Sequence, residues 1–251
     1  MEKWVGHVAF VTGASAGIGK AVAEELVEQG LKVIGFARRK ELLDELEKKL
    51  SSKKGKFYAY AGDASKEEDI LKACQWTKDN VGSISVLINN AAILGLAKLS
   101  ECETKIWQQQ LDVNVLAPCI TAKEAIKQMK ENKIDGHIIN INSTAGHKII
   151  PNQKLNLYNS TKYALTALTE TLRLQLALEG SKIRVTSISP GGVRTDMMNT
   201  ALAEFGIPAD STLSINLLEP TDIANAVLYV LSTPATVNIT ELTIQATGEK
   251  M

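Results

Sequence analysis

The 251-residue chain has few of the residues that build disulfide frameworks or metal sites. Its three cysteines, Cys74, Cys102 and Cys119, are widely spaced and include no CxxC pair, so we expect reduced thiols. Its three histidines form no HExxH motif, so we expect no metal in the site. These shortages point away from a small disulfide-rich domain and from a metalloenzyme.

The chain also lacks an excess of charge and a long apolar run. Its 28 lysines and arginines balance its 28 aspartates and glutamates, which argues against binding to nucleic acid or to a charged membrane surface. No apolar stretch approaches the ~20 residues that a membrane span requires, and the first residues lack the apolar core of a signal peptide. We therefore expect a cytoplasmic protein with no nucleic acid and no membrane partner.

What the chain does contain is a regular alternation of short apolar runs and longer amphipathic ones. The short runs are rich in Val and Ile and predict buried strands, whereas the longer ones repeat their apolar residues at helical spacing. This alternation predicts an α/β fold, with one doubly wound parallel sheet in a single domain covering residues 1–251. The expected strands are residues 7–12, 32–36, 57–60, 86–89, 137–141, 183–188 and 239–244.

Helices are expected between these strands. Ser65 with Glu68, and Ser100 with Glu103, have the spacing of capping boxes, and the second pair precedes a helical stretch to about residue 129. Long irregular segments in compact domains are usually lids or binding loops, so we predict that residues 194–218 form a substrate-binding loop. The other expected helices run from about residue 18 to 30, 42 to 50, 157 to 179 and 220 to 230.

A glycine-rich sequence, TGASAGIG, follows the first expected strand and opens a helix. Gly13, Gly17 and Gly19 allow the backbone to turn tightly and to approach a pyrophosphate at the positive end of that helix. The strand before it and the helix after it give this motif more weight than the spacing alone. The alternative is a glycine turn with no ligand.

Two arginines, Arg38 and Arg39, follow the second expected strand, where NAD-binding folds normally have an acidic residue for the ribose hydroxyl. Arginine pairs with phosphate in a fork and keeps its charge, so the pair indicates recognition of a 2′-phosphate and hence NADP. The alternative is a solvated basic pair. Asp63 and Ala64 after the third strand are expected near the adenine, although Asp63 could equally be an ordinary residue before a helix.

The sequence YNSTK places Tyr158 and Lys162 one helical turn apart, on the same face of a helix. A neighbouring ammonium favours the phenolate and is expected to lower the pKa of the phenol, which would make it a usable acid or base. Ser143 ends the fifth expected strand and could hold a substrate oxygen beside the phenol. Ser143 is not predicted to be a hydrolase nucleophile, because its flanks are not GxSxG and His147 follows only four residues later.

An internal proline indicates an irregular helix near Asn114. Pro118 has no N–H to donate to the Asn114 carbonyl, so we infer a kink that frees this carbonyl. The alternative is a tolerated kink with an exposed carbonyl. The amides of Asn89 and Asn90 end the fourth expected strand, where they could cap a helix or hold the loop on the cofactor side.

Together these residues resemble the short-chain dehydrogenase/reductase family over essentially the whole chain. The motifs that carry the resemblance are TGASAGIG, NNAA, Asn114, Ser143, YNSTK and SPGGVRT. The resemblance implies a Rossmann-type fold with a seven-stranded sheet and a catalytic tetrad of Asn114, Ser143, Tyr158 and Lys162. In the tetrad the tyrosine exchanges a proton, the serine holds the carbonyl, the lysine grips the nicotinamide ribose and the asparagine carbonyl orders a water. The cofactor-binding residues implied are Gly13, Ser15, Gly17, Ile18, Gly19, Arg38, Arg39, Asp63, Ala64, Asn90, Tyr158, Lys162, Pro190, Gly191, Val193 and Thr195.

Within the family, the segments GLKVIGFARR, DGHIININS and LSTPA resemble the farnesol dehydrogenase-like group. Two features depart from the family pattern: NNAA replaces the commoner NNAG, and Ala16 replaces the basic residue that many NADP-using members carry in the glycine loop. Arg38 and Arg39 are thus left to contact the 2′-phosphate. The resemblance also implies a homodimer or homotetramer, paired through the helices at 103–129 and 157–179.

The predicted function is that of an NADP(H)-dependent alcohol dehydrogenase or carbonyl reductase. The loops around the expected site are apolar, which favours a hydrophobic alcohol or carbonyl such as a sesquiterpenoid, a steroid or a lipophilic xenobiotic. The alternative is a non-catalytic NADPH-binding sensor or scaffold of the same fold, which would have no need of the tetrad. The apolar loop residues are Ile93, Leu94, Ile149, Ile150, Pro151, Met197, Met198, Leu202, Phe205, Ile207 and Leu213.

Overall fold

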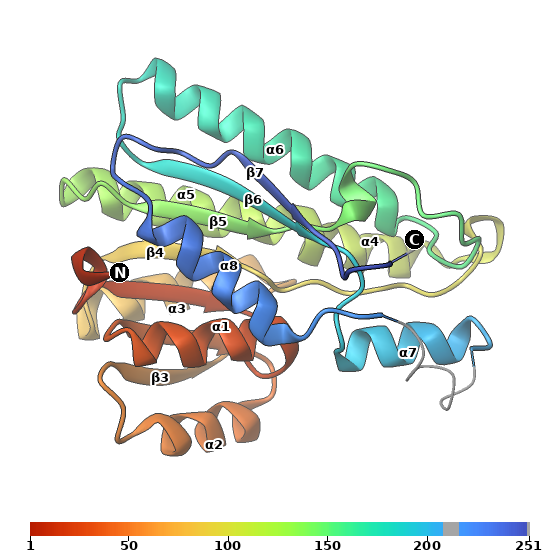
Figure 1. Cartoon of the computed structure of the whole chain (residues 1–251), viewed down its shortest axis with the longest axis horizontal. Helices are drawn as coiled ribbons and strands as arrows, with labels where there is room; N and C mark the ends of the chain where they lie inside the picture. Colours follow the sequence, from red (N-terminus) through yellow and green to blue (C-terminus); the bar gives the residue numbers. More distant parts are fainter. Residues whose placement is uncertain (208–215, 250–251) are drawn as a thin grey trace.

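A seven-stranded parallel sheet forms the centre of the protein (Figure 1). The structure, a computed structural model, describes residues 1–207 and 216–249. The strands lie in the order β3-β2-β1-β4-β5-β6-β7, which confirms the doubly wound sheet in a single domain. The strands are β1 (Val8–Thr12), β2 (Lys32–Ala37), β3 (Lys56–Ala61), β4 (Ile84–Asn89), β5 (His137–Ile141), β6 (Arg184–Pro190) and β7 (Glu241–Ile244).

Helices cover both faces of the sheet. In Figure 1, α1 and α8 lie side by side in front of it. The helices are α1 (Gly17–Glu28), α2 (Lys40–Leu50), α3 (Glu67–Asn80), α4 (Thr104–Leu111), α5 (Ala117–Glu131), α6 (Tyr158–Leu178), α7 (Asp196–Glu204) and α8 (Pro220–Ser232). Short 3₁₀ turns lie at Glu2–Trp4, Leu99–Glu101 and Thr144–Gly146.

Each face of the sheet has its own hydrophobic core. On one face, α1, α2 and α8 pack Leu26, Leu46 and Val227 against the strands. On the other, α3, α5 and α6 pack side chains such as Ile70 and Met129. Successive strand residues point to opposite faces, so strands covered on both sides are apolar throughout, as β1 and β4 are.

The strand order reverses between β1 and β4. The chain leaves β1 toward β2 and β3 on one side, and continues from β4 toward β5 and β6 on the other, while β1 and β4 themselves pair from Val8 to Val11. The loops at the carboxyl ends of these two strands therefore diverge and leave a crevice between them. This is the position at which doubly wound sheets bind their ligands.

The two predicted capping boxes are wrong. Helix α3 begins at Glu67 after Lys66, because the Ser65 hydroxyl donates to the Asp63 carboxylate (2.9 Å) instead of capping the helix. Helix α4 begins after Glu103, and its first turn has no side-chain cap. A capping box does form at α8, where Glu219 and Asp222 bond to each other's backbone N–H groups.

Residues 194–218 are not the wholly irregular segment that was expected. Helix α7 occupies residues 196–204, and the Thr195 hydroxyl caps it by accepting the Met198 N–H (3.3 Å). Leu202 of this helix is 3% exposed, so it packs into the protein and does not line a loop. Residues 208–215 of the expected binding loop, which include Pro208, Asp210 and Leu213, lie outside the described residues.

We expect the buried Gln128 side chain to be important for stability. Its Oε1 accepts the Ile84 N–H (3.0 Å) and its Nε2 donates to the Cys74 carbonyl (3.1 Å), which ties α5 to β4 and α3. Gln128→Ala should lower the free energy of unfolding by about 2–4 kcal/mol, because it leaves two buried backbone groups unpaired. Urea denaturation measures this loss of stability.

The exposed Gln75, bonded to Asp79, is the matched control. Gln75→Ala should cost less than about 0.5 kcal/mol, and equal losses in the two variants would contradict the assignment.

Candidate active site

A cavity of about 410 Å³ opens at the carboxyl edge of the sheet, in the crevice between the loops of β1 and β4. Its wall includes the glycine loop after β1 and the two arginines after β2, and also Tyr158 and Lys162 beside the end of β5, which β1 and β4 separate from β2 in the sheet. The cavity therefore brings together most of the residues that the sequence singled out. Those that line it are Gly13, Ser15, Gly17, Ile18, Arg38, Arg39, Asp63, Ala64, Asn90, Tyr158, Lys162 and Thr195.

The glycine loop directs the start of α1 at this cavity. Gly13 has a φ of +70°, and a Cβ there would lie 2.8 Å from the Asn90 amide, so only glycine fits this turn. Helix α1 has no side-chain cap and no acidic residue in its first turn. Its first N–H groups are thus left to a ligand, and with the helix dipole they form a site for an anion.

Thr12 and Asn90 fix the glycine loop to β4. The Thr12 hydroxyl oxygen accepts the backbone N–H groups of Asn90 and Ala91, each at 3.0 Å. The Asn90 amide in turn donates to the carbonyls of Thr12 (2.9 Å) and Gly13 (3.3 Å). Asn90 therefore shapes the loop from behind, although its side chain also reaches the cavity. Thr12 opens the TGASAGIG motif but was not predicted as a site residue, because the sequence does not show that its hydroxyl reaches the backbone after β4.

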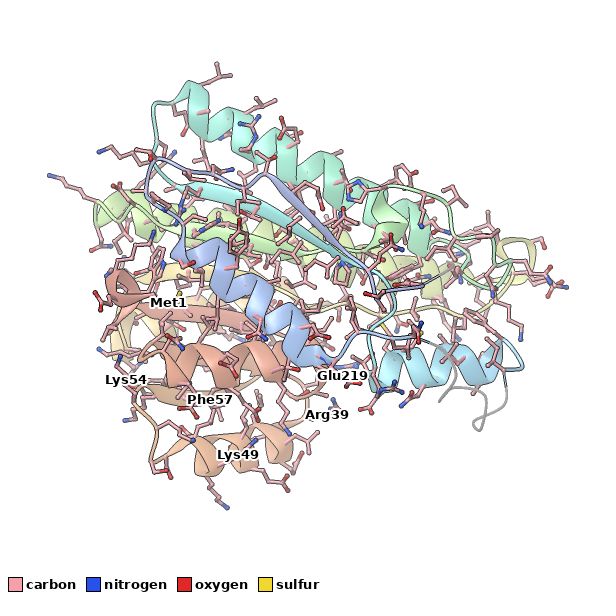
Figure 2. All side chains as sticks on the ribbon, viewed as in Figure 1. Met1, Arg39, Lys49, Lys54, Phe57 and Glu219 are labelled. Carbon is pink, nitrogen blue, oxygen red and sulfur yellow. The ribbon has the colours of Figure 1, made fainter. Side chains whose placement is uncertain are left out.

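The end of β2 is basic, as predicted. Arg39 (labelled in Figure 2) donates to the Ser15 hydroxyl of the glycine loop, at 3.2 and 3.3 Å. Burial alone would raise the pKa of Asp63, but hydrogen bonds from Ser65 and the charges of Arg38 and Lys66 lower it overall. Asp63 accepts the Ser65 N–H (2.9 Å), so its carboxylate closes the turn after β3.

Tyr158 and Lys162 lie in the first turn of α6 and face the cavity. The Lys162 Nζ is 5.8 Å from the centre of the Tyr158 ring and donates to the Ile141 carbonyl at the end of β5 (3.0 Å). Lys162 is 3% exposed. An ammonium has three N–H donors, and among the described residues the Ile141 carbonyl is its one hydrogen-bond acceptor. The remaining donors are available to a ligand in the cavity.

Burial governs the ionisation of both side chains. It raises the pKa of the Tyr158 phenol to about 12, against the opposing effect of a hydrogen bond with the Ser143 side chain. It lowers the pKa of the Lys162 ammonium to about 8. The pKa of Tyr158 was expected to be lowered by the ammonium and by a cationic nicotinamide, but in this structure it is raised, because the cost of burying a phenolate is the larger effect.

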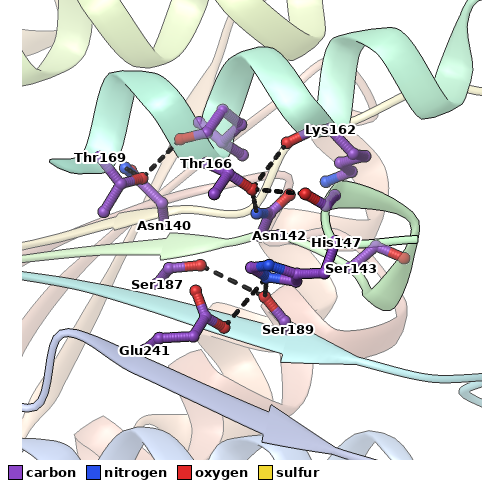
Figure 3. Close-up of polar contacts among 12 residues, drawn as sticks. Asn140, Asn142, Ser143, His147, Lys162, Thr166, Thr169, Ser187, Ser189 and Glu241 are labelled. Carbon is purple, nitrogen blue, oxygen red and sulfur yellow. Dashed lines mark hydrogen bonds and ion pairs between the residues drawn. The ribbon is translucent and has the colours of Figure 1, made fainter. Parts of the chain in front are cut away.

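Ser143 lies at the end of β5, beside the cavity. Its hydroxyl oxygen accepts the Ala145 N–H (3.1 Å), which orients the side chain at the start of the Thr144–Gly146 turn. Behind this turn, Asn142 donates to Thr166 (2.8 Å) and Asn140 donates to Thr169 (2.8 Å), so β5 and α6 are joined by buried amide–hydroxyl pairs (Figure 3).

His147 follows the same turn and contacts β6. Its Nε2 lies 2.9 Å from the Ser189 hydroxyl and 3.4 Å from the Glu241 carboxylate (Figure 3). This ring therefore joins the turn that carries Ser143 to the two last strands of the sheet.

The helix around Asn114 departs from α geometry, as the position of Pro118 indicated. Residues Asp112–Leu116 form a π-helix, and the Ala117 N–H donates to the Asp112 carbonyl. The Asn114 side chain is 1% exposed and bonds to both backbone groups of Ile93 (2.9 and 3.0 Å) and to the Thr161 hydroxyl (3.1 Å). It thus holds the loop after β4 against α6, while a role for its carbonyl stays a prediction.

Some predicted cofactor residues lie beside the cavity. Gly19 packs inside α1 against the Gly13 carbonyl. Pro190, the last residue of β6, and Gly191 and Val193 after it were also predicted, but they do not line the wall. Ile93 and Met197, which were predicted as apolar residues around the substrate site, do line it. Residues that line it without having been predicted as site residues are Ala16, Phe36, Ala37, Gly62, Ala91, Ala92, Val113, Ile141, Asn142 and Asp196.

The residues present fit a phosphorylated dinucleotide. The uncapped start of α1 suits a pyrophosphate, and the donors at the end of β2 are two arginines and a serine, with no carboxylate of β2 itself to accept a ribose hydroxyl. The spare donors of Lys162 suit sugar hydroxyls. Within residues 1–207 and 216–249, no cluster of His, Cys, Asp and Glu could hold a metal ion. Nor is any helix of that described part long and apolar enough to cross a membrane.

Comparisons with known proteins agree with this geometry. Residues 7–204 match a family model described as short chain dehydrogenase. The chain is 43% identical to farnesol dehydrogenase of Aedes aegypti over 252 residues, covering 100% of both chains. It is also 43% identical to dehydrogenase/reductase SDR family member 11 of Homo sapiens, over 99% of this chain and 97% of the relative. The alcohol dehydrogenase of Thermococcus sibiricus, solved in complex with 5-hydroxy-NADP, superposes with a TM-score of 0.84 at 25% identity, over 98% of both chains.

Proposed function

The chain belongs to the short-chain dehydrogenase/reductase family of oxidoreductases, and we propose that it uses NADP(H) to interconvert a hydrophobic alcohol and its aldehyde or ketone. One observation carries the proposal: a single cavity is lined by Tyr158 and Lys162 and also by Arg38 and Arg39. The first pair suits proton exchange with a substrate oxygen, and the second suits a 2′-phosphate.

Tyr158 is the residue that exchanges the proton. When bound, the dinucleotide supplies or accepts the hydride. In the reducing direction, the phenol gives its proton to the carbonyl oxygen, and with a pKa of about 12 it is protonated and ready to do so at neutral pH. Ser143, whose oxygen is held by the Ala145 N–H, directs its own hydroxyl proton to the same substrate oxygen. Lys162 holds the ribose hydroxyls and leaves a positive charge near the phenol.

The charge at the end of β2 supports NADP over NAD. Arg38 and Arg39 are exposed at the mouth of the cavity, and Arg39 is already directed toward the glycine loop by Ser15. A 2′-phosphate placed there would accept charge-assisted hydrogen bonds from both guanidinium groups. The named ligand of the Thermococcus sibiricus alcohol dehydrogenase is a modified NADP, which is consistent with this choice.

Apolar side chains near Tyr158 support a hydrophobic substrate. Ile93 and Met197 line the cavity, and Ile149, just beyond the turn that carries Ser143, is 64% exposed. An apolar ligand would cover these groups and gain free energy in proportion to the area buried. The name of the Aedes aegypti relative points in the same direction. A sesquiterpenoid such as farnesol, a steroid or another lipophilic carbonyl is therefore the proposed substrate class.

The predicted pairing of subunits fits the apolar surface of the same helices. Leu111 ends α4, Leu116 lies in the π-helix, and Tyr163 and Leu174 lie on α6, each between 38% and 49% exposed. A second copy of the chain would remove these side chains from water. The homodimer or homotetramer and the cytoplasmic location stay predictions.

Loss of the Tyr158 hydroxyl tests the chemistry. Tyr158→Phe should bind NADPH with unchanged affinity and lose turnover by a factor on the order of 10²–10⁴, because only the proton donor is removed.

In the wild type, kcat for oxidation should rise with pH, because oxidation needs the phenolate, and kcat for reduction should fall at alkaline pH, because reduction needs the phenol. A variant that keeps both turnover and these profiles would contradict the role. Binding of NADPH by the wild type without turnover of any carbonyl would favour the sensor or scaffold.

Cofactor choice depends on the two arginines. Arg38→Ala and Arg39→Ala should each raise the KM for NADPH by about tenfold and leave the KM for NADH unchanged, since a charged hydrogen bond contributes about 1.5 kcal/mol at the lower end of its range. Steady-state kinetics with both cofactors measure this. Lys40, an adjacent exposed cation paired with Asp44, is the matched control, and Lys40→Ala should change neither value. Wild-type enzyme that uses both cofactors equally well would contradict the assignment.

Substrate class is tested with a homologous series of straight-chain aldehydes. Each added methylene contributes up to about 0.8 kcal/mol when buried, so kcat/KM should rise by up to about fourfold per carbon until the pocket is filled. Met197→Ser should reduce this slope and leave the rate with the shortest aldehyde almost unchanged. A flat or falling trend in the wild type would exclude an apolar pocket.

A further inference from the structure

The C-terminal turn of the chain places a carboxylate against the segment that follows β6. After β7 the chain reverses near Gly248, whose φ is +81°. The Glu249 Oε1 then accepts the Gly192 N–H (3.0 Å), and its Oε2 accepts the Ala246 N–H (3.1 Å). In Figure 1 the C-terminal end lies on the same side of the molecule as α7, beyond the carboxyl ends of the strands. One carboxylate therefore joins the end of the chain to the Pro190–Val193 segment.

The contact between Glu249 and this segment is close. A Cβ built on Gly191 would lie 2.3 and 2.4 Å from the two carboxylate oxygens, so they lie directly against the Gly191 backbone. Any larger residue at this position would displace Glu249. The segment follows β6, which pairs with β5, and Ile141 at the end of β5 lines the cavity and its carbonyl accepts a hydrogen bond from the Lys162 ammonium; the segment therefore lies on the Tyr158 and Lys162 side of the site, away from the arginines after β2.

The fold does not depend on Glu249 to hold this segment in place. The Gly191 N–H donates to the Ile244 carbonyl of β7 (2.7 Å). The segment also pairs with Leu218, whose N–H donates to the Gly192 carbonyl (2.8 Å) and whose carbonyl accepts the Arg194 N–H (2.8 Å). Glu249 thus adds a fourth contact to a segment that is already fixed, and what it adds besides a hydrogen bond is a negative charge.

That charge has no cationic partner in the described part of the chain. No Lys, Arg or His of residues 1–207 and 216–249 forms an ion pair with Glu249, and within this part of the chain its carboxylate accepts the N–H groups of Gly192 and Ala246. The polar groups elsewhere at the cavity are mainly donors: the start of α1, the arginines and Lys162. Two carboxylates, Asp63 and Asp196, also line the cavity, and Glu249 adds a further negative charge just outside its wall, at the carboxyl ends of β6 and β7.

We propose that Glu249 is a positioning residue for the nicotinamide end of the cofactor, and that its charge tightens the binding of NADP⁺ relative to NADPH. The inference rests on the proposed function. The oxidised nicotinamide ring is a cation and the reduced ring is neutral, so a nearby carboxylate attracts only the oxidised form. The rest of the two cofactors is the same, so the effect appears in the ratio of their dissociation constants.

The test compares cofactor affinities of the full-length wild type and of Glu249→Gln. Glutamine has the same shape and keeps an oxygen for the Gly192 N–H, but it has no charge. Titration by calorimetry should show the Kd of NADP⁺ rising by about three- to tenfold, as for one partly exposed charge pair, and that of NADPH changing by less than about twofold. The difference should shrink at high ionic strength. Glu249→Asp, which restores the charge, should return the ratio toward that of the wild type.

Glu131→Gln is the matched control, because it removes an equal charge at the far end of α5, where Glu131 pairs with Lys78. It should leave both dissociation constants unchanged. If Glu249→Gln raised the dissociation constants of NADP⁺ and NADPH equally, Glu249 would only support the segment mechanically. If neither dissociation constant changed, Glu249 would have no effect on the site. Both results overturn the inference but leave the proposed function intact. A wild type that binds neither cofactor would overturn the proposed function as well.

Discussion

The site depends first on the hydrogen bonds that join the end of β1 to the end of β4. Thr12 and Asn90 exchange a set of contacts there, in which each side chain satisfies the backbone of the other strand. The chain departs from these two strands in opposite directions. The hydrogen bonds between Thr12 and Asn90 therefore fix the distance between the glycine loop and the loop that follows β4. The start of α1, the arginines after β2 and the loop held by Asn114 all take their positions from it.

A second constraint is the joining of α6 to β5. Thr166 and Thr169 accept the amides of Asn142 and Asn140, so the helix that carries Tyr158 cannot slide along β5, which ends two residues before Ser143. An amide–hydroxyl pair buried between a helix and a sheet is costly to break, since both partners would lose their hydrogen bonds. The relative placement of phenol and serine hydroxyl is thus set by residues that take no part in proton exchange.

The doubly wound parallel sheet, the sheet edge that holds the site and many of the residues in its wall were predictable. Each rests on a local pattern: apolar periodicity, glycines after a strand, or two residues four apart. Contacts between distant segments were not predictable. Ser65 has the spacing of a helix cap, yet Asp63 captures its hydroxyl. Leu202 is apolar and was predicted to lie in the substrate-binding loop, yet its side chain is buried in the protein. Glu249 lies 57 positions from Gly192, and no periodicity in the sequence connects them.

The ionisation of Tyr158 and Lys162 also depends on burial, which the sequence does not give. An ammonium that is 3% exposed and bonds to one carbonyl is under-satisfied, and the lowered pKa of about 8 records that cost. A ligand with hydroxyl groups in the cavity would supply the missing acceptors and favour the charged form. That charge, once stabilised, would in turn favour the phenolate of Tyr158. The ligand that fills the cavity would therefore lower the pKa of Tyr158 toward neutral pH, where the phenol can exchange its proton.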